Sequence, residues 1–591
     1  MKTINLLRFF LGILSCLFYS LTAYAESCTP NTFEGAFSGE VTLCQNWDAR
    51  DQQKFWFLSQ GSQIIPYKWF LFLEQPTNAK LFVDGQHMDG FRYLPQQKTA
   101  LNPDGLPIGF TKDAASNNPA YQRISQDWLG LSCAACHTGQ VEYQGKKVLI
   151  DGAPTMADIE SFMHTLVKAM QATTSDSQKF DRFAKNVLAG SYADASAKDK
   201  LKTQLEQMIE IRQAWNTMNA GDSPYGFARL DAIGAIFNTI TSTAMGIPGN
   251  RHPANAPVSY PFIWDTPQHD KVQWNGSVAN KGGGALGRNV GEVLGVFASL
   301  KLNTNPFLLT GHHSSADISH LGQLEALLWQ LQSPQWPATL LPKIDETKLA
   351  AGRKAFEQYC LSCHADIRRD DPNRRIKAVL TPLDELKTDP AMTANFSNIQ
   401  YESGKLHHRS KKYIPSTNLF GKTGAGVEFL NYSVVGTIAK NLFEHPAETV
   451  RAINAGRSNK AEQIRELVGP EAVRETLKKI AEDIHLANPA PSQLVYKGRP
   501  LNGIWATAPY LHNGSVRTLR QLLLPAAQRQ KAFQVGNREY DPNDVGFKDA
   551  GGFLFNTSLP GNSNTGHEYG AQDLAEHPDK LNALLDYLKS L

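Results

Sequence analysis

Two copies of the pattern C-x-x-C-H place the strongest constraint on what this chain can fold around. With 7 Cys and 16 His in 591 residues, chance predicts about 0.002 matches to the pattern. It supplies two thiols that can bond to the same edge of a porphyrin and a histidine that can bind its iron from one face. The two copies are Cys133, Cys136 and His137, and Cys360, Cys363 and His364.

Covalent haem attachment competes with two other uses of paired cysteines. A zinc site would need further Cys or His pairs at suitable spacing. A thioredoxin-like redox pair would sit on a strand-to-helix turn of a βαβ unit. Neither use explains a histidine directly after the second cysteine in both copies. The sequence therefore predicts two covalently bound c-type haems, with His137 and His364 as the proximal iron ligands.

The amino terminus has the pattern of an export signal. Two basic residues precede an apolar run over residues 9–21, and small residues follow at Ala23 and Ala25. This predicts a signal peptide that is cut after Ala25. A lipoprotein signal at Cys16 is the alternative, although the apolar run continues past it. Since no later segment reaches the roughly 18 apolar residues of a membrane span, we expect a periplasmic or secreted protein with no transmembrane segment.

The other cysteines fit an oxidising compartment. Cys16 leaves with the signal, and Cys28 and Cys44 remain outside the two motifs. We expect a disulfide between these two, which would close a short loop and add about 3 kcal/mol of stability in the chain-entropy model.

Composition describes an ordinary globular protein. Hydrophobic residues make up 41% of the chain and charged residues 19%, and the formal net charge is +3. That charge is small for the length, and no long Lys/Arg block occurs, so nothing indicates binding to nucleic acid through its phosphates.

Length and pattern predict several domains. The predicted fold class is mainly α, with two tandem cytochrome c-type haem domains, long ordered loops near residues 250–290, and an N-terminal extension. The predicted parts are a signal peptide (1–25), the N-terminal extension (26–120), a first haem domain (121–342) and a second haem domain (343–591). Helices are expected over residues 157–171, 197–218, 230–242, 348–359, 461–487 and 573–591.

Two aromatic runs in the N-terminal extension leave two interpretations open. Residues 55–58 (FWFL) and 69–73 (WFLFL) lie on either side of Pro66. They are either core segments or an apolar surface that faces a hydrophobic substrate or a membrane.

The run PYLHNGSV at residues 509–516, downstream of two C-x-x-C-H motifs, resembles the diheme oxidoreductase superfamily of bacterial cytochrome c peroxidases and methylamine-dehydrogenase maturation enzymes. Three further segments are most similar to its rubber oxygenase branch, which also resembles the diheme fatty-acid dioxygenases. These segments are residues 129–138, the loop 260–276 with Trp264 and Trp274, and residues 564–570 (NTGHEYG). The resemblance covers most of the mature chain.

This resemblance implies that His512 is the distal ligand of the second haem, opposite His364. It also implies that dioxygen or substrate meets iron at the first haem, on His137, which is the expected catalytic residue. Members of the superfamily often hold a calcium ion between the haems. The sequence has no contiguous calcium-binding loop, so calcium stays an open alternative.

No residue stands out as a sixth ligand for the first haem, and an open site fits an oxygenase or a peroxidase better than an electron carrier. Trp264 and Trp274 are candidates for passing electrons between the haems, or are packing residues. Arg229 and Arg288 are candidates for binding haem propionates. The weaker candidates for a sixth ligand are His164, His252, His269 and Met245.

Three functions compete. The favoured one is a dioxygenase that acts on an apolar alkene, such as polyisoprene or an unsaturated fatty acid, at the first haem. The second is a peroxidase that reduces hydrogen peroxide with electrons from a small donor protein, and it would need a distal acid such as Glu292. The third is an electron-transfer cytochrome with no enzymatic activity.

Overall fold

The computed structural model describes residues 39–114, 126–280, 282–303, 311–455, 469–487 and 493–591. The described residues are 44% helical and 14% strand, and they form 18 α-helices and many small sheets. The fold is therefore mixed α/β, and the expectation of a mainly α chain with two tandem haem domains is wrong. The sequence pattern did not predict these strands, because they span only two to six residues. That is too short for a clear alternation of apolar and polar residues.

The first part of the chain builds two small sheets around the first C-x-x-C-H motif. Its elements are β1 (Glu40–Thr42), α2 (Ala49–Phe57), β2 (Ile65–Pro66), α3 (Tyr67–Phe72), α4 (Gly85–Gly90), β3 (Phe110–Asp113), β4 (Trp128–Leu131), β5 (Thr138–Tyr143) and β6 (Lys146–Asp151). One sheet has the order β1-β6-β5 and the other β2-β4-β3. Because the motif lies between β4 and β5, each sheet anchors one of its ends.

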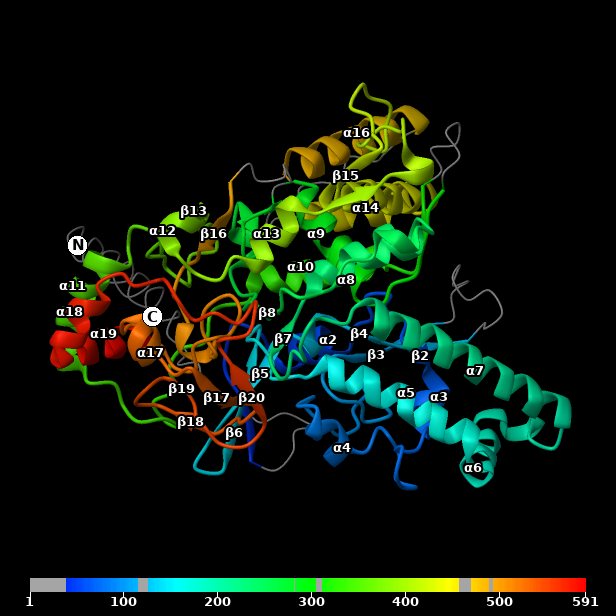
Figure 1. Cartoon of the computed structure of the whole chain (residues 1–591), viewed down its shortest axis with the longest axis horizontal. Coiled ribbons are helices and arrows are strands. Elements are labelled where there is room, and N and C mark those ends of the chain that lie inside the picture. Colours follow the sequence, from blue (N-terminus) through cyan, green and yellow to red (C-terminus); the bar gives the residue numbers. More distant parts are fainter. Residues whose placement is uncertain (1–38, 115–125, 281, 304–310, 456–468, 488–492) are drawn as a thin grey trace, which may run out of the picture.

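Three helices then form an arm on one side of the molecule (Figure 1). They are α5 (Ile159–Ser175), α6 (Ser177–Leu188) and α7 (Ala195–Met218). Helix α5 starts where the Asp158 carboxylate accepts a hydrogen bond from the Ser161 amide at 2.9 Å, and it buries Phe162, Leu166 and Met170 at helical spacing. The helices expected over residues 157–171 and 197–218 are confirmed.

The middle of the chain alternates short ribbons with helices. Its elements are β7 (Arg229–Leu230), α8 (Ala232–Phe237), β8 (Val258–Ser259), β9 (Lys271–Val272), β10 (Val278–Ala279), α9 (Gly284–Gly295), β11 (Leu300–Lys301), β12 (His313–Ser314) and α10 (Ile318–Gln330). A π-helical turn over Asn238–Ala244 continues α8, so residues 230–242 are largely helical as expected. The glycine-rich end of the predicted loop instead begins helix α9.

The part that follows carries the second motif. Its elements are α11 (Leu349–Tyr359), β13 (Val379–Pro382), α12 (Leu383–Leu386), α13 (Ala391–Asn398), β14 (Gln400–Glu402), β15 (Thr423–Ala425), α14 (Gly426–Glu444), α15 (Pro446–Ala455) and α16 (Gly469–Ala487). Helix α11 confirms the helix expected before the motif, and α16 confirms the described part of the one expected over residues 461–487.

The carboxy-terminal part returns to the second motif. Its elements are β16 (Val495–Gly498), α17 (Leu519–Leu522), β17 (Ala532–Val535), β18 (Tyr540–Asp541), β19 (Gly546–Phe547), β20 (Phe553–Asn556), α18 (Ala571–Glu576) and α19 (Pro578–Ser590). Strand β16 pairs with β13, and α19 packs on α11 (Figure 1). A break at His577 divides the helix expected over residues 573–591 into α18 and α19.

One hydrophobic core draws residues from every part of the chain. It joins Trp56 of the first part, Trp264 of the middle, and Trp505 and Leu584 of the last, all fully buried. The aromatic runs at residues 55–58 and 69–73 contribute to this core and to a neighbouring one. Their interpretation as core is therefore confirmed, and the surface interpretation is wrong. The boundaries after residues 120 and 342 stay predictions.

Two expectations concern the amino terminus and membranes. Residues 1–38, with the predicted signal peptide and Cys28, lie outside the described residues. Cys44 is disulfide-bonded, but its pairing with Cys28 stays a prediction. Among the helices of the described ranges, none combines the length and apolar character that crossing a membrane requires.

The contact between α11 and α19 gives a prediction about stability. A Cβ at Gly352, inside α11, would lie 2.0 Å from the carbonyl oxygen of Ala583 in α19. Alanine normally favours a helix over glycine, but here it would force the two helices apart. We expect Gly352→Ala to lower the free energy of unfolding by about 1–3 kcal/mol, measured by chemical denaturation. Gly190→Ala is the control, because its Cβ would meet no atom within 4 Å; equal effects from the two changes would contradict the packing argument.

Candidate haem-binding site

The two C-x-x-C-H motifs adopt the same tight turn. In the first, the amides of Cys136 and His137 both donate to the carbonyl of Cys133, at 3.2 and 3.0 Å. In the second, the amides of Cys363 and His364 donate to the carbonyl of Cys360, at 3.1 and 2.9 Å. Such a turn brings both thiols and the imidazole close together. All four cysteines are free thiols and half-buried.

Both motif histidines are oriented by a backbone carbonyl. Nδ1 of His137 lies 2.8 Å from the carbonyl oxygen of Pro261, and Nδ1 of His364 lies 2.6 Å from that of Arg499. Because a carbonyl only accepts, each Nδ1 carries the proton and Nε2 keeps its lone pair for a metal ion. Burial lowers the pKa of His137 to about 4 and also lowers the pKa of His364. Both rings are therefore neutral at pH 7, as a metal ligand must be.

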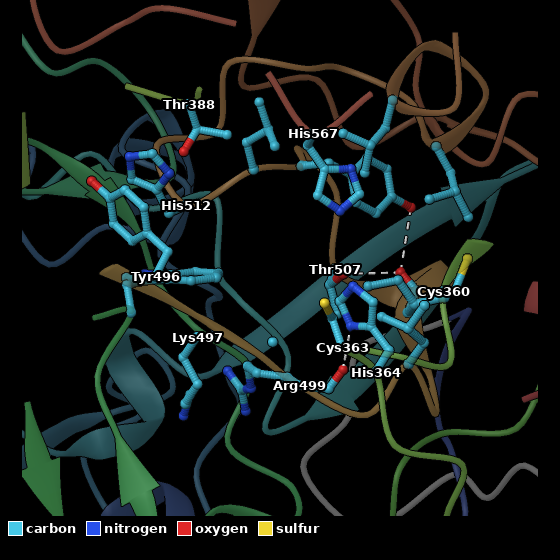
Figure 2. Close-up of a pocket in the computed structure, with 18 of the residues that line it drawn as sticks. Cys360, Cys363, His364, Thr388, Tyr496, Lys497, Arg499, Thr507, His512 and His567 are labelled. Carbon is cyan, nitrogen blue, oxygen red and sulfur yellow. Dashed lines mark hydrogen bonds between the residues drawn. The ribbon is translucent and has the colours of Figure 1, made fainter. Parts of the chain in front are cut away.

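A mostly apolar cavity of about 190 Å³ adjoins the second motif. Cys360, Cys363 and His364 line one side of it (Figure 2). Segments that are far apart in the sequence supply the rest of its wall, including β16 and the loops around His512 and His567. An apolar space with two thiols and an oriented imidazole on its wall fits a covalently attached porphyrin.

His567 is the imidazole that faces His364. The two ring centroids are 6.2 Å apart, with 62° between the ring planes, and Figure 2 shows a nitrogen of each ring on the side of the other. Metal–imidazole bonds are about 2 Å long, so this spacing leaves room for one metal ion between the rings. Burial, with the nearby His364 and Arg529, lowers the pKa of His567 to about 3.

The loop that presents His567 is firmly held. The amide of His567 donates to the carbonyl of Leu386 at 2.9 Å. The guanidinium of Arg529 donates to the carbonyls of Asn564 and Gly566 at 2.6 and 2.9 Å. The NTGHEYG segment thus fixes its histidine through contacts with two distant parts of the chain.

His512 lines the same cavity but has a different ring partner. Its imidazole stacks on Tyr496, with the centroids 4.1 Å apart and the planes 24° apart, and both rings lie on the opposite side from Cys360 (Figure 2). Its backbone carbonyl accepts from the amide of Ser259 at 2.8 Å. Among the ring contacts of the described residues, His364 is paired with His567 and not with His512. Ligation by His512 stays a prediction that this geometry does not favour.

Helix α9 lies near the first motif. Arg288 and Glu292, one turn apart on this helix, are close enough to Cys133 for their charges to act on the pKa of its thiol. Both also line a cavity of about 30 Å³ whose other walls are mostly aliphatic. Burial raises the pKa of Glu292, although its carboxylate accepts a hydrogen bond from Gln273. A cavity of this size can hold a small molecule, since one water needs about 10–15 Å³.

The remaining candidates from the sequence have other surroundings. Trp264 is fully buried and stacks on Phe262 with centroids 4.7 Å apart, whereas Trp274 lines the larger cavity. Arg288 forms an ion pair with Glu325, and Arg229 binds the side chain of Asn562 at 2.7 Å, so both proposed propionate ligands already have partners.

Among the weaker candidates, His164 and His252 line two other small cavities, Met245 packs against a hydrophobic core, and His269 is buried.

Sequence reasoning missed three residues of the larger cavity: His567, Lys497 and Arg499. The NTGHEYG segment stood out in the sequence, but its histidine did not. For calcium, no group of three or more His, Cys, Asp or Glu side chains that could hold a metal ion occurs within the described parts of the chain.

Comparison with known proteins agrees with this geometry. A family model described as RoxA-like, cytochrome c-like matches residues 495–534, which run from β16 to β17 along one wall of the larger cavity. A protein named uncharacterized protein y4iJ, from Sinorhizobium fredii (strain NBRC 101917 / NGR234), is 32% identical over 610 residues that cover 93% of each chain. Uncharacterized protein y4iM from the same strain is 46% identical over 66 residues, 11% of this chain and 15% of that protein.

The matched RoxA-like segment indicates a haem-binding c-type cytochrome. It contains Arg499 and His512, which line the same cavity as the second motif. The match to y4iJ extends over nearly the whole of both chains. This chain therefore belongs to the y4iJ family and carries a RoxA-like cytochrome c segment.

Proposed function

We propose that this protein is an exported diheme c-type cytochrome oxidoreductase with two unlike haem sites, and that it works as a dioxygenase on an apolar alkene. One observation carries the proposal: His364 faces a second imidazole, His567. In the ring contacts of the described residues, His137 has no such partner. His364 and His567 would together hold the iron of the second haem, and His137 would hold that of the first.

A six-coordinate c-type haem supplies electron transfer, and one with an open position supplies reactions of dioxygen or peroxide. The residues of this chain orient the histidines that would bind the two irons. The carbonyls of Pro261 and Arg499 hold the two proximal imidazoles in a single tautomer. At the second site, the loop held by Arg529 keeps His567 in place. Near the first motif, Arg288 and Glu292 of α9 line a small cavity whose other walls are mostly aliphatic.

The proposed substrate class rests on the resemblance. The rubber oxygenase branch implies an apolar alkene such as polyisoprene or an unsaturated fatty acid. The cavity beside α9 suits a small apolar molecule such as dioxygen better than a bulky substrate.

A peroxidase is the second candidate, and Glu292 favours it. This carboxyl group lines the cavity near the first motif, and burial raises its pKa. A carboxylic acid group can donate its proton to a peroxide oxygen as the O–O bond breaks. If the protein is a peroxidase, we expect Glu292→Gln to slow the consumption of hydrogen peroxide by about 10²–10⁴-fold, measured with a reduced small cytochrome as the electron donor.

Dioxygen uptake decides between these functions. The purified protein with its haems attached is mixed with an unsaturated fatty acid or a polyisoprene latex in an oxygen electrode, and the products are analysed by mass spectrometry. We expect dioxygen consumption together with oxygenated or cleaved products, without added peroxide. Turnover of hydrogen peroxide but of neither alkene would support the peroxidase instead.

A further inference from the structure

Three basic side chains lie close together beside the larger cavity. Lys497 and Arg499 line the cavity itself. His269 is only 2% exposed, and the positive charges of Lys497 and Arg499 act on it strongly enough to lower its pKa further below the value that burial produces. Lys497 and Arg499 are therefore the two basic side chains of this wall, and His269 lies near them as a neutral imidazole.

These basic side chains have no acidic partner in the described parts of the chain. The ammonium of Lys497 donates to the carbonyl of Lys271 at 3.0 Å, and the guanidinium of Arg499 donates to the carbonyl of Phe262 at 2.6 Å. Nε of Arg499 and both ring nitrogens of His269 are buried without a hydrogen-bond partner among the described residues. A buried cation without a counterion is strongly unfavourable, which indicates that an anion completes the site.

The two acidic residues that act on Lys497 and Arg499 interact with other groups. Asp265 acts on the pKa of Arg499, but its Oδ1 forms an ion pair with Arg374 at 2.7 Å, and its Oδ2 has no hydrogen-bond partner among the described residues. Asp270, which acts on the pKa of Lys497, accepts a hydrogen bond from the amide of Ala378 at 2.8 Å. Neither carboxylate forms an ion pair with Lys497 or Arg499 among the described residues, so a bound anion can complete the site.

The positions of the side chains around the cavity indicate which anion binds there. Figure 2 shows Lys497 and Arg499 on the opposite side from Cys360. A porphyrin attached through its vinyl groups carries its two carboxylates on the edge away from those bonds. Guanidinium and ammonium groups are strong hydrogen-bond donors to carboxylates.

We propose that Lys497 and Arg499 bind the propionate carboxylates of the haem at the second motif. This inference rests on the proposed second haem. Arg499 also connects this anion site to both motif histidines. Its own carbonyl orients His364, and its guanidinium binds the carbonyl of Phe262, the residue after the Pro261 that orients His137.

The midpoint potential of the six-coordinate haem tests the proposal. A cation near the haem opposes the extra positive charge of ferric iron, so removing it lowers the potential. The variants Arg499→Gln and Lys497→Gln are purified with haem attached, and each is titrated by spectroscopy. We expect a lower potential in both, unchanged covalent haem content, and a smaller shift in Arg499→Lys, which keeps the charge. The carbonyl that orients His364 remains in every variant.

Arg212→Gln is the matched control. Arg212 is another buried arginine that donates to backbone carbonyls, those of Ile64 at 2.6 Å and Gln63 at 2.8 Å, but it does not line this cavity. Its removal should leave the potential unchanged. Wild-type potentials in both Arg499→Gln and Lys497→Gln would overturn the proposal, and if Arg499→Gln does not fold, Lys497→Gln alone decides.

Two further measurements identify the anion that the cationic wall binds. A diffusible carboxylate is the rival occupant, so acetate and hexanoate are added to the wild-type protein. A saturable change in its spectrum or potential would overturn the propionate assignment, and no response supports it. Covalent haem is also counted in the wild-type protein, and its absence at Cys360 and Cys363 would instead remove the proposed function on which the inference rests.

Discussion

Replacing His567 by alanine should convert the second haem from low spin to high spin while leaving it covalently attached. The variant removes the imidazole whose ring centroid lies 6.2 Å from that of His364, but neither cysteine of the motif. We expect the low-spin signal in the electron paramagnetic resonance spectrum to disappear. Added imidazole should restore it, because the empty position accepts a free ligand.

His512→Ala is the matched control for this experiment. His512 lines the same cavity and is more buried than His567, but its ring stacks on Tyr496. We expect His512→Ala to retain the low-spin signal. If the two results are exchanged, with His512→Ala losing the signal and His567→Ala keeping it, then ligation by His512, as the PYLHNGSV run implies, is correct and the pairing with His567 is not.

The second large effect concerns the two cysteine pairs. Cys133→Ala/Cys136→Ala should lose one covalent haem and reduce dioxygen uptake to the level of protein-free buffer, because the reactive site is proposed at His137. Cys360→Ala/Cys363→Ala should also lose one haem, but with it the low-spin signal. Covalent haem is counted by mass spectrometry of the denatured chain.

The contrast between these two double variants is the informative result. Both remove half of the covalent haem, so a general folding defect would affect them alike. Dioxygen binding that survives in Cys133→Ala/Cys136→Ala and is lost only in Cys360→Ala/Cys363→Ala would place the reactive site at the second motif and contradict the assignment to His137.

Local sequence patterns predicted the positions of several helices, but they did not predict the fold class. Helix α5 has apolar residues at helical spacing and an Asp158 cap, and α11 precedes the second motif as expected. The fold class was wrong because the strands are short and pair across long sequence separations, as β13 and β16 do. The aromatic runs were ambiguous because an apolar segment has the same composition in a core as on a binding surface.

The site was predictable where its residues are adjacent in the sequence. The residues that form the turn of each C-x-x-C-H motif are consecutive in the sequence, so the turn could be predicted. His567 could not be paired with His364 from the sequence, because a loop 203 residues further along the chain, counted as 567 − 364, supplies it. Lys497 and Arg499 looked like ordinary charged residues, since their lack of acidic partners is visible only in three dimensions.

The most direct test of two unlike haem sites is the electron paramagnetic resonance spectrum of the purified wild-type protein with its haems attached, recorded with its electronic spectrum before and after reduction and exposure to dioxygen. We expect one low-spin haem with two histidine ligands and a second haem whose spectrum changes with dioxygen. Two low-spin haems that respond to neither dioxygen nor peroxide would contradict the account and leave an electron-transfer cytochrome.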